Sequence, residues 1–399
     1  MSKRIVLLGV TGVSKSLALE QLEHYRNTYT EQGFKSIEFM RDFIEPEITL
    51  QDYLDSREDR QRHYWLEGWT KFAKVLPTVE NTILSLHGVL VRPLYTIRTP
   101  IDLDSLKQFR PDTIITLIDD VYMMWHRTTQ RAAQEESKGR PTLEQLLTGR
   151  RAELFLGDII RSHCEVKRQN TLIAVKHPAR VLDRLLFGPP NLRCIYLSFP
   201  ISGPRRDQVG GDDSGIKEVN TFLSQAAKFE KDNAGFVCFN PLTIDELPML
   251  GLLKGSTKKK LVEFSSAKRW NVRKFLGNET LLTLDSDTPP TFELKRDELD
   301  RADGLIRADV ATRDYRLVMQ SDFLVVFNPW YDGRETGGVG NEIRCALFHR
   351  IPVKIYQDKE HDRSGQARKQ LKKAPGSLGA PTESTYIQFY ETTDDLLTP

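Results

Sequence analysis

The stretch RIVLLGVTGVSKS, residues 4–16, decides the fold of the front half of this chain. A short aliphatic run leads into a glycine turn, and a helical pattern follows over residues 17–25. A strand, a glycine-rich turn and a helix in this order are typical of a phosphate-binding loop, because the N–H groups of the turn and of the helix start point at the anion. The sequence therefore predicts an α/β domain built around this turn.

Particular residues of the loop would bind ATP or another nucleoside triphosphate. Lys15 would supply a mobile positive charge, and the Ser16 hydroxyl is placed for Mg²⁺. Ser14 stands where the pattern has glycine, which adds a Cβ where backbone and phosphate approach closely. A second Mg²⁺ candidate is Asp119, at the acidic end of the apolar run 113–118, although a helix N-cap explains that position equally well. The predicted phosphate-binding residues are Gly9, Gly12, Val13, Ser14, Lys15 and Ser16.

Composition narrows the functional classes. A chain of 399 residues with 39% hydrophobic content is long enough for two domains. Lysine plus arginine (57) nearly balance aspartate plus glutamate (55), so small molecules are the expected partners rather than nucleic acid. The widely spaced cysteines form no metal motif, which favours reduced thiols in the cytoplasm. The chain start is expected to be a first strand rather than a signal peptide, and no apolar stretch reaches the roughly 18 residues of a membrane span.

Apolar runs of strand length alternate with longer helical patterns, which is typical of parallel α/β architecture. A glycine and two prolines at residues 188–190 predict a boundary between a domain of residues 1–188 and one of residues 191–399. Residues 254–298 and 358–380 break the alternation and are predicted surface insertions. The predicted strands are residues 4–8, 88–91, 113–118 and 171–175, then 194–199, 236–239, 323–327, 353–356 and 386–389.

The front half resembles the archaeal-type adenylate kinases and related P-loop nucleoside monophosphate kinases over residues 4–180. The matching segments are GVTGVSKS (9–16), RQR (60–62), IRTP (97–100) and RPDTIITLIDD (110–120). The resemblance implies a parallel sheet with helices on both faces and an arginine-rich lid over the phosphates, since guanidinium grips phosphate bidentately. It leaves open whether the domain transfers phosphate or only binds nucleotide. The lid candidates are Arg127, Arg131, Arg150, Arg151 and Arg161.

The rear half carries an ordered set of polar motifs between its apolar runs. They are IYLSFPISGPRRD (195–207), the pair Arg313 and Asp314, QSD (320–322) before FLVVF, Asn328 with Pro329, and TGGVGNE (336–342). The glycines permit close approach of a ligand, and the N–H groups of a helix start favour an anion.

This set resembles the nucleoside 2-deoxyribosyltransferase-like family, which includes the nucleotide N-glycoside hydrolases, over residues 193–399. The resemblance implies a Rossmann-like, flavodoxin-like domain and assigns Glu342 as the nucleophile at the anomeric carbon and Asp314 as the general acid for the leaving base. Cleavage of a C–N glycosidic bond passes through an oxocarbenium-like state, which one carboxylate stabilises while another group protonates the base. Asp322, the third catalytic candidate, either orients the sugar hydroxyls or only terminates a strand.

Small residues, hydroxyls and guanidinium groups around these motifs are candidates for binding the substrate and its 5′-phosphate. The glycosidase site requires no cofactor, and the resemblance implies a homo-oligomer in which a neighbouring subunit completes each site. The substrate-binding candidates are Ser198, Ser202, Gly203, Arg205, Arg206, Asp207, Asn328, Thr336 and Gly338.

Three functions follow from these motifs. The first is an N-glycosidase or deoxyribosyltransferase acting on a nucleotide or a related N-riboside such as NAD⁺, with an ATP-binding front domain as regulator or second activity. Such an enzyme would suit nucleotide depletion in antiviral defence, or salvage. The second is a nucleoside monophosphate kinase whose rear domain supplies or trims substrates. The third is a nucleotide sensor in which neither pocket turns over.

Overall fold

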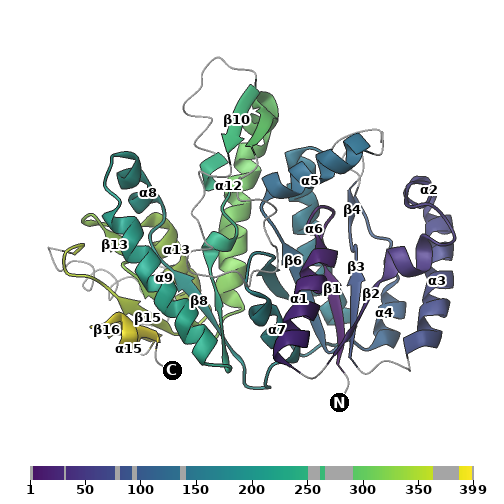
Figure 1. Ribbon diagram of the computed structural model, residues 1–399, viewed down its shortest axis with the longest axis horizontal. Helices are drawn as coiled ribbons and strands as arrows, with labels where there is room; N and C mark the ends of the chain where they lie inside the picture. Colours follow the sequence, from purple (N-terminus) through teal and green to yellow (C-terminus); the bar gives the residue numbers. More distant parts are fainter. Residues whose placement is uncertain are drawn as a thin grey trace. The chain divides into compact units, whose positions relative to one another are not determined.

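The computed structural model describes residues 3–30, 33–76, 81–91, 97–134, 141–249, 261–265, 291–362 and 386–397. Its chain divides into two compact units (Figure 1). The first unit takes in Met1–Phe187 together with the described parts of Ile244–Trp270 and Glu279–Val310, and the second takes in Gly188–Thr243 and Ala311–Pro399. Each unit is an α/β structure around one five-stranded parallel sheet.

The sheet of the first unit has the strand order β2-β3-β1-β6-β7, and every neighbouring pair is parallel. Strands β1, β3 and β6 are buried almost throughout, as expected for a parallel sheet covered on both faces. The strands are β1 (Arg4–Leu8), β2 (Lys35–Glu38), β3 (Thr82–Leu86), β6 (Thr113–Ile118) and β7 (Thr171–Ala174).

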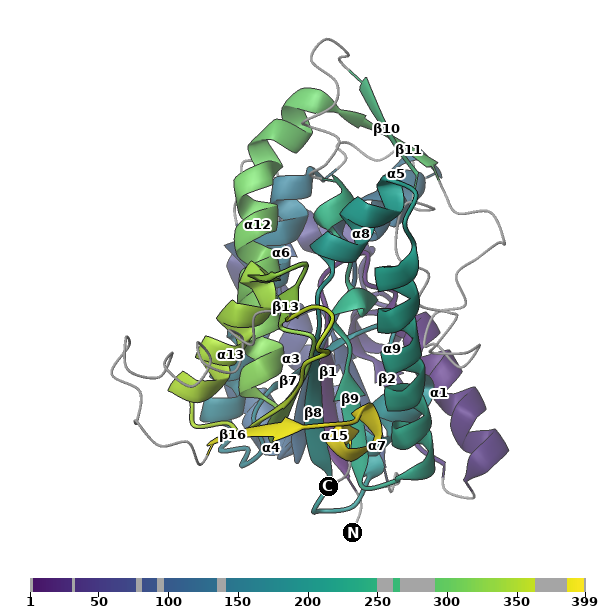
Figure 2. The same cartoon turned by 90° about the vertical axis from the view of Figure 1, so that its left-hand side faces the viewer.

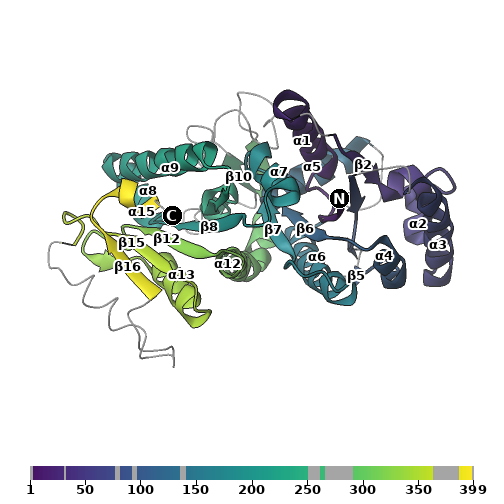
Figure 3. The same ribbon diagram turned by 90° about the horizontal axis from the view of Figure 1, so that it is seen from below.

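Helices cover both faces of this sheet. Figure 3 shows α1 (Lys15–Tyr29) and α7 (Ala179–Phe187) on one face, and α4 (Leu103–Phe109) and α6 (Leu143–His163) on the other. The remaining helices of this part are η1 (Met40–Ile44), α2 (Leu50–Asp55), α3 (Glu58–Val75) and α5 (Val121–Gln134), and β4 (Leu90–Val91) pairs with β5 (Ile97–Arg98).

The predicted strand over residues 88–91 was misplaced. The strand that pairs with β1 is β3, which ends two residues earlier at Leu86, whereas Leu90 and Val91 form only the short antiparallel pair with β5. Strand β2 was not predicted. The run GVLV is as apolar as TILSL, so only pairing with β1 decides which of them enters the sheet.

A buried arginine ties a distant part of the chain into the first unit. Arg150, on α6, donates from both Nη atoms to the Glu246 carboxylate at 2.8 and 3.0 Å. Its Nε donates to Oδ2 of Asp309 at 2.7 Å, and Nη1 donates to the Asp119 carbonyl at 2.8 Å. Arg150, Glu246 and Asp309 are only 4%, 1% and 4% exposed, so these charges compensate one another out of contact with water.

This cluster explains a difference from the predicted domain ranges. The sequence predicted one continuous rear domain over residues 191–399, but the described residues between Ile244 and Val310 belong to the first unit. Two further contacts join these residues to the first unit. The Val121 N–H at the start of α5 donates to Glu246 at 2.7 Å. The Leu143 N–H at the start of α6 donates to Glu298 at 2.9 Å. Glu246, which precedes the predicted insertion, and Glu298, at its end, thus supply carboxylates to helix starts, where negative charge is favourable.

Within that part, β10 (Leu261–Ser265) and β11 (Thr291–Lys295) form an antiparallel pair that Figure 2 shows beside the long helix α12 (Arg296–Met319). Residues of α12 up to Val310 belong to the first unit and those from Ala311 to the second.

The sheet of the second unit has the order β16-β15-β12-β8-β9 and is also parallel throughout. Its strands are β8 (Arg193–Ser198), β9 (Phe236–Phe239), β12 (Phe323–Phe327), β15 (Val353–Tyr356) and β16 (Ile387–Tyr390).

Figure 3 shows α9 (Ser214–Asp232) on one face of this sheet and α13 (Gly337–Phe348) on the other. The end of the polar motif 195–207 forms the start of helix α8 (Ser202–Val209), which packs on α9. The smaller elements are η4 (Pro241–Thr243), the pair β13 (Trp330–Tyr331) and β14 (Arg334–Glu335), and α15 (Thr393–Leu397). Among the residues described, no helix is long and apolar enough to cross a membrane.

The Arg150 cluster makes a prediction about stability. Replacing Arg150 by methionine leaves Glu246 and Asp309 buried without their cation, and we expect a loss of about 3–5 kcal/mol in the unfolding free energy of the first unit. Chemical denaturation measures this loss. The control is Arg301→Met, which removes a cation that is about half exposed and is paired with Glu144 and Asp297, and should change stability little. An unchanged Arg150→Met midpoint would contradict the account.

Candidate functional site

In the sheet of the second unit, the order in which the chain adds strands reverses between β8 and β12. From β8 the chain moves to β9 on one side, then crosses back to place β12 on the other side of β8. In open parallel sheets, ligands bind at the carboxyl ends of the two strands where this reversal occurs. Residues that end β8 and residues that follow β12 are therefore the first place to look for a site.

Two hydroxyls from β8 meet one carboxylate at this edge. Tyr196 and Ser198 are two residues apart on the strand, so their side chains point to the same face of the sheet. The Tyr196 hydroxyl donates to Oε1 of Glu342 at 2.8 Å, and the Ser198 hydroxyl donates to Oε2. Both oxygens of the Glu342 carboxyl group are thereby bound, which fixes the group in one orientation.

Glu342 occupies a position that the helix pattern reserves for an apolar residue. The buried residues of α13 form one stripe, and Glu342 lies on it beside Ile343, between Val339 and Ala346. It is 8% exposed. A glutamate is almost never buried unless it is paired or functional, so its place on this stripe needs a reason beyond the favourable charge near a helix start.

A second carboxylate faces the same place from α12. Asp314 is half-buried, and its Oδ1 accepts a hydrogen bond from Nε of its neighbour Arg313 at 2.9 Å and lies 2.8 Å from Nη2 of the same guanidinium. The side chain of Arg313 is 7% exposed. The structure thus brings together two predicted catalytic residues, Glu342 and Asp314, and the predicted binding residue Ser198.

Burial, followed by the charge of Asp314, raises the pKa of Glu342 to about 8, although the hydrogen bonds from Ser198 and Tyr196 act in the opposite direction. Burial also raises the pKa of the Tyr196 hydroxyl well above its usual value, and the charges of Asp314 and Glu342 add to that shift. Burial thus opposes ionisation of both the Tyr196 hydroxyl and the Glu342 carboxyl group.

Asp322 lies at the opposite edge of the sheet. Its carboxylate accepts the backbone N–H of Cys194 at 2.6 Å, where β8 begins, and its own N–H donates to the Cys194 carbonyl at 2.7 Å. Four residues of β8 separate Cys194 from Ser198, or roughly 13 Å of strand. Of the two interpretations left open by the sequence, this geometry favours a structural role at the start of a strand, away from Ser198 and Glu342.

Several predicted binding residues instead hold α8 in place. The Tyr331 hydroxyl donates to Asp207 at 2.9 Å, and its ring fills a slot against Gly203 and Gly215. A Cβ on Gly203 would lie 2.5 Å from the Tyr331 ring, so glycine is required there for packing rather than for a ligand.

The remaining candidates of this unit lie on loops and helix starts near the carboxyl edge. Asn328 has a φ of 47° and accepts the Asp358 N–H at 2.7 Å, which joins the loops after β12 and β15. The Thr336 hydroxyl donates to the Pro329 carbonyl at 3.0 Å, and Gly338 faces open space. Ser202 is exposed at the start of α8, Arg205 is half-buried, and Arg206 is exposed beside Asp207.

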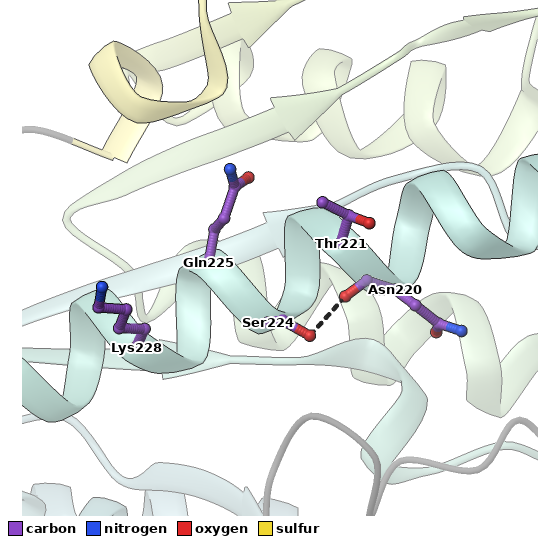
Figure 4. A pocket seen from close by; sticks show the side chains of 5 residues that line it. All are labelled: Asn220, Thr221, Ser224, Gln225 and Lys228. Atoms are coloured by element: carbon purple, nitrogen blue, oxygen red, sulfur yellow. Dashed lines mark hydrogen bonds between the residues drawn. The ribbon is translucent and has the colours of Figure 1, made fainter.

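A shallow hollow of about 390 Å³ lies on the outer side of α9 (Figure 4). The residues that line it are polar or charged, and one contact among them is the Ser224 hydroxyl donating to the Asn220 carbonyl at 2.8 Å. None of the predicted site residues lines it. It is lined by Asn220, Thr221, Ser224, Gln225 and Lys228.

The phosphate-loop sequence of the first unit forms a tight turn between β1 and α1. The Lys15 ammonium group lies within the loop, where it donates to the Gly9 carbonyl at 2.5 Å and to Nδ1 of His87 at 3.0 Å. Beneath the loop, the fully buried Glu153 accepts the N–H groups of Gly9 and Gly88 at 3.0 and 2.9 Å. Burial raises the pKa of Glu153, and the nearby Lys15 charge opposes the shift.

Two residues of the loop adopt left-handed backbone conformations. Gly12 has a φ of 94°, and a Cβ there would lie 2.9 Å from the Met124 carbonyl of α5. Ser14 has φ 59° and ψ 53° and makes no side-chain cap to α1. The glycine that the sequence pattern has at position 14 is thus replaced by a residue that is strained in this conformation.

The predicted magnesium site fits these residues poorly. Asp119 is fully buried, its Oδ2 accepts from Arg127, and its Oδ1 accepts the Asp120 N–H at 2.8 Å with the Lys176 ammonium 3.6 Å away. Two cations, Arg127 and Lys176, already compensate this carboxylate, which leaves Asp119 poorly suited to bind a metal ion. Ser16 is exposed at the start of α1.

The predicted lid arginines are engaged within the fold. Arg127 pairs with Asp119, Arg150 with Glu246 and Asp309, and Arg151 with Asp309 at 2.5 Å. Arg161 is half-buried on α6, and the side chain of Arg131 lies outside the described part of the chain. The lid assignments of Arg127, Arg150 and Arg151 do not hold, because their guanidinium groups serve carboxylates of the fold.

Sequence reasoning missed four residues at the two sites. Tyr196 carried a signal, because it precedes Ser198 by two residues on the same strand. Arg313 was noted only as the neighbour of Asp314. Glu153 and His87 carried none, since only the packing of α6 and the end of β3 brings them under the loop.

Comparison with known proteins adds no assignment: no protein-family model matches the chain, and no curated protein matches it either.

The left-handed Ser14 leads to a prediction about the loop. Glycine adopts this conformation without the steric cost that a Cβ brings, so Ser14→Gly should stabilise the first unit by about 1 kcal/mol. Thermal or chemical denaturation measures the change. Ser14→Ala, which keeps the Cβ, is the matched control and should not gain. Equal stability of the two variants would show that the Cβ causes no strain.

Proposed function

We propose that the second unit cleaves the N-glycosidic bond of a nucleoside, a nucleotide or a related N-riboside. The observation that carries the proposal is the pairing of a buried carboxyl group, Glu342, with a second carboxylate, Asp314, at the carboxyl edge between β8 and β12. Two carboxyl groups in different environments are the minimum for this chemistry, because one must stabilise positive charge at the anomeric carbon while a proton reaches the base.

The geometry fits a reaction with a covalent intermediate. The Tyr196 and Ser198 hydroxyls hold Glu342 in one orientation, which suits a nucleophile that must approach a single carbon atom. Asp314, which is bonded to Arg313, would serve the leaving base. Water, or an acceptor base in a transferase, would then release the sugar. The resemblance to the nucleoside 2-deoxyribosyltransferase-like family supports the same roles.

For the first unit we propose nucleotide binding without phosphoryl transfer. The turn of residues 9–16 and the start of α1 offer backbone N–H groups to phosphates, with Lys15 beside them. A kinase additionally needs cations that neutralise the transferred phosphoryl group. Arg127, Arg150 and Arg151 are bonded to carboxylates of the fold, which favours a binding role that regulates the second unit.

The glycosidase proposal predicts release of free base from a panel of ribo- and deoxyribonucleosides, their nucleotides and NAD⁺, followed by chromatography. Glu342→Gln should lower kcat by about 10³-fold or more, because the nucleophile is lost. Asp314→Asn should also lower it strongly. The matched control is Asp322→Asn, at the opposite sheet edge, which should retain activity. Equal losses in Asp314→Asn and Asp322→Asn would contradict the site.

The nucleotide-binding proposal predicts that ATP binds to the purified protein in calorimetry and that Lys15→Met abolishes this binding, because the phosphates lose their mobile cation. Incubation with ATP and each nucleoside monophosphate should form no ADP above that of the Lys15→Met control. ADP formation that depends on Lys15 would overturn the binding-only role and restore the kinase hypothesis.

A further inference from the structure

The two carboxyl groups of the second unit have different hydrogen-bond partners. Oδ1 of Asp314 accepts a charge-assisted hydrogen bond from Nε of Arg313 at 2.9 Å, and Nη2 of the same guanidinium lies 2.8 Å from that oxygen as an ion pair. Glu342, among the residues described, is bonded only to the hydroxyls of Tyr196 and Ser198. A guanidinium that pairs with a carboxylate and donates a hydrogen bond to it favours the ionised form, whereas a hydroxyl bonds to either form.

Other groups around Glu342 do not reverse this difference. The Asp314 charge disfavours a second negative charge nearby, and the Arg313 charge, which favours one, is bonded to Asp314. Two adjacent carboxyl groups in a buried place rarely ionise together, so such a pair keeps one proton near neutral pH. The titratable and charged groups that interact with Glu342 are Tyr196 from β8, Arg313, Asp314 and Tyr315 from α12, and Cys345 from α13.

We propose that the resting site carries one proton on Glu342, because Arg313 holds Asp314 as the carboxylate, and that this same proton departs with the base. The location of the proton stands independently, whereas its use rests on the proposed glycosidase. Arg313 acts through Asp314 and is therefore a positioning residue. Glu342, which the family resemblance assigns as the nucleophile, is thus protonated before the reaction begins. It must lose this proton before it can attack the anomeric carbon.

The proton balance closes over one turnover. The proton passes from Glu342 by way of Asp314 to a nitrogen of the base, and the electron pair of the breaking C–N bond stays with the base. An Oε atom of the ionised Glu342 forms the bond to the anomeric carbon. Water then attacks that carbon, the glycosyl–Glu342 bond breaks with its electron pair returning to Glu342, and the proton of water returns to the carboxyl pair. No oxidant or reductant is required.

The location of the proton is tested without activity, by thermal unfolding of Glu342→Gln and Asp314→Asn from pH 5 to pH 9. A glutamate whose pKa rises from 4.5 to about 8 on folding stabilises the protein below pH 4.5 and loses that contribution as the pH rises through 8. Glutamine is an isostere of the protonated acid. Glu342→Gln should therefore match the wild type at pH 5 and exceed its Tm by at least about 5 °C at pH 9.

Asp314→Asn leaves Arg313 without its carboxylate and should lower Tm at every pH. It should also flatten the pH dependence of Tm, because Glu342 then ionises more readily. If Asp314→Asn does not fold, the Glu342→Gln series decides by itself. A Glu342→Gln Tm below that of the wild type throughout this pH range would overturn the inference, because it would mean that Glu342 is ionised at rest.

The use of the proton is tested by two substrates. Release of a purine base should decline above about pH 8, where the pair loses its proton. Hydrolysis of p-nitrophenyl ribofuranoside, whose leaving group departs without a proton, should instead increase through the same pH range. Parallel profiles for the two substrates would overturn this step. Absence of any turnover with the expected Tm pattern would reject the glycosidase and leave the proton on Glu342.

Discussion

The burial of Glu342 on the apolar stripe of α13 is the constraint on which the account of the second unit depends. Placing an ionisable group there has a cost that the fold must offset. The hydroxyls of Tyr196 and Ser198 satisfy both carboxyl oxygens, and retention of the proton avoids a buried charge. Each of these features also prepares a carboxyl group for chemistry, because it is oriented, shielded from water and close to a second carboxylate.

In the first unit, the cost of burying charged groups is offset by ion pairs rather than by keeping a carboxyl group protonated. Arg150 is bonded to two carboxylates and a carbonyl, and Asp119 lies beside two cations. Each of these buried charges is therefore compensated by a charge of the opposite sign. A cluster compensated in this way has a structural use: it brings the residues around Glu246 and Asp309 into the first unit. The site of the second unit differs, because the Arg313 guanidinium is bonded to only one of the two carboxyl groups, Asp314. The charges of the Arg150 cluster are compensated, which suits a structural role. The carboxyl groups of Glu342 and Asp314 are not compensated equally by Arg313, which suits a chemical role.

Much of this was visible in the sequence. The β1 turn and the strands that form the centre of both sheets follow from apolar runs beside glycine turns, and Glu342 and Asp314 were predicted as partners. The sequence could not identify the partners of the predicted lid arginines, because a guanidinium group binds a carboxylate as well as a phosphate. Asp322 directly precedes its strand, and in a parallel sheet that position lies at the amino ends of the strands, away from the carboxyl ends where ligands bind. The Arg150 cluster joins residues about 100 and 160 positions apart, a distance that no local pattern reports.

The most direct test of the central claim is the mass of the protein during turnover. Wild-type protein is mixed with a 2′-fluoro nucleoside, which slows release of the sugar, then quenched in acid and digested for mass spectrometry. The account predicts a peptide that contains Glu342 and is heavier by one fluorosugar, together with a sugar product of retained configuration. Base release with no adduct and with inverted configuration would contradict it, because water would then attack the anomeric carbon directly.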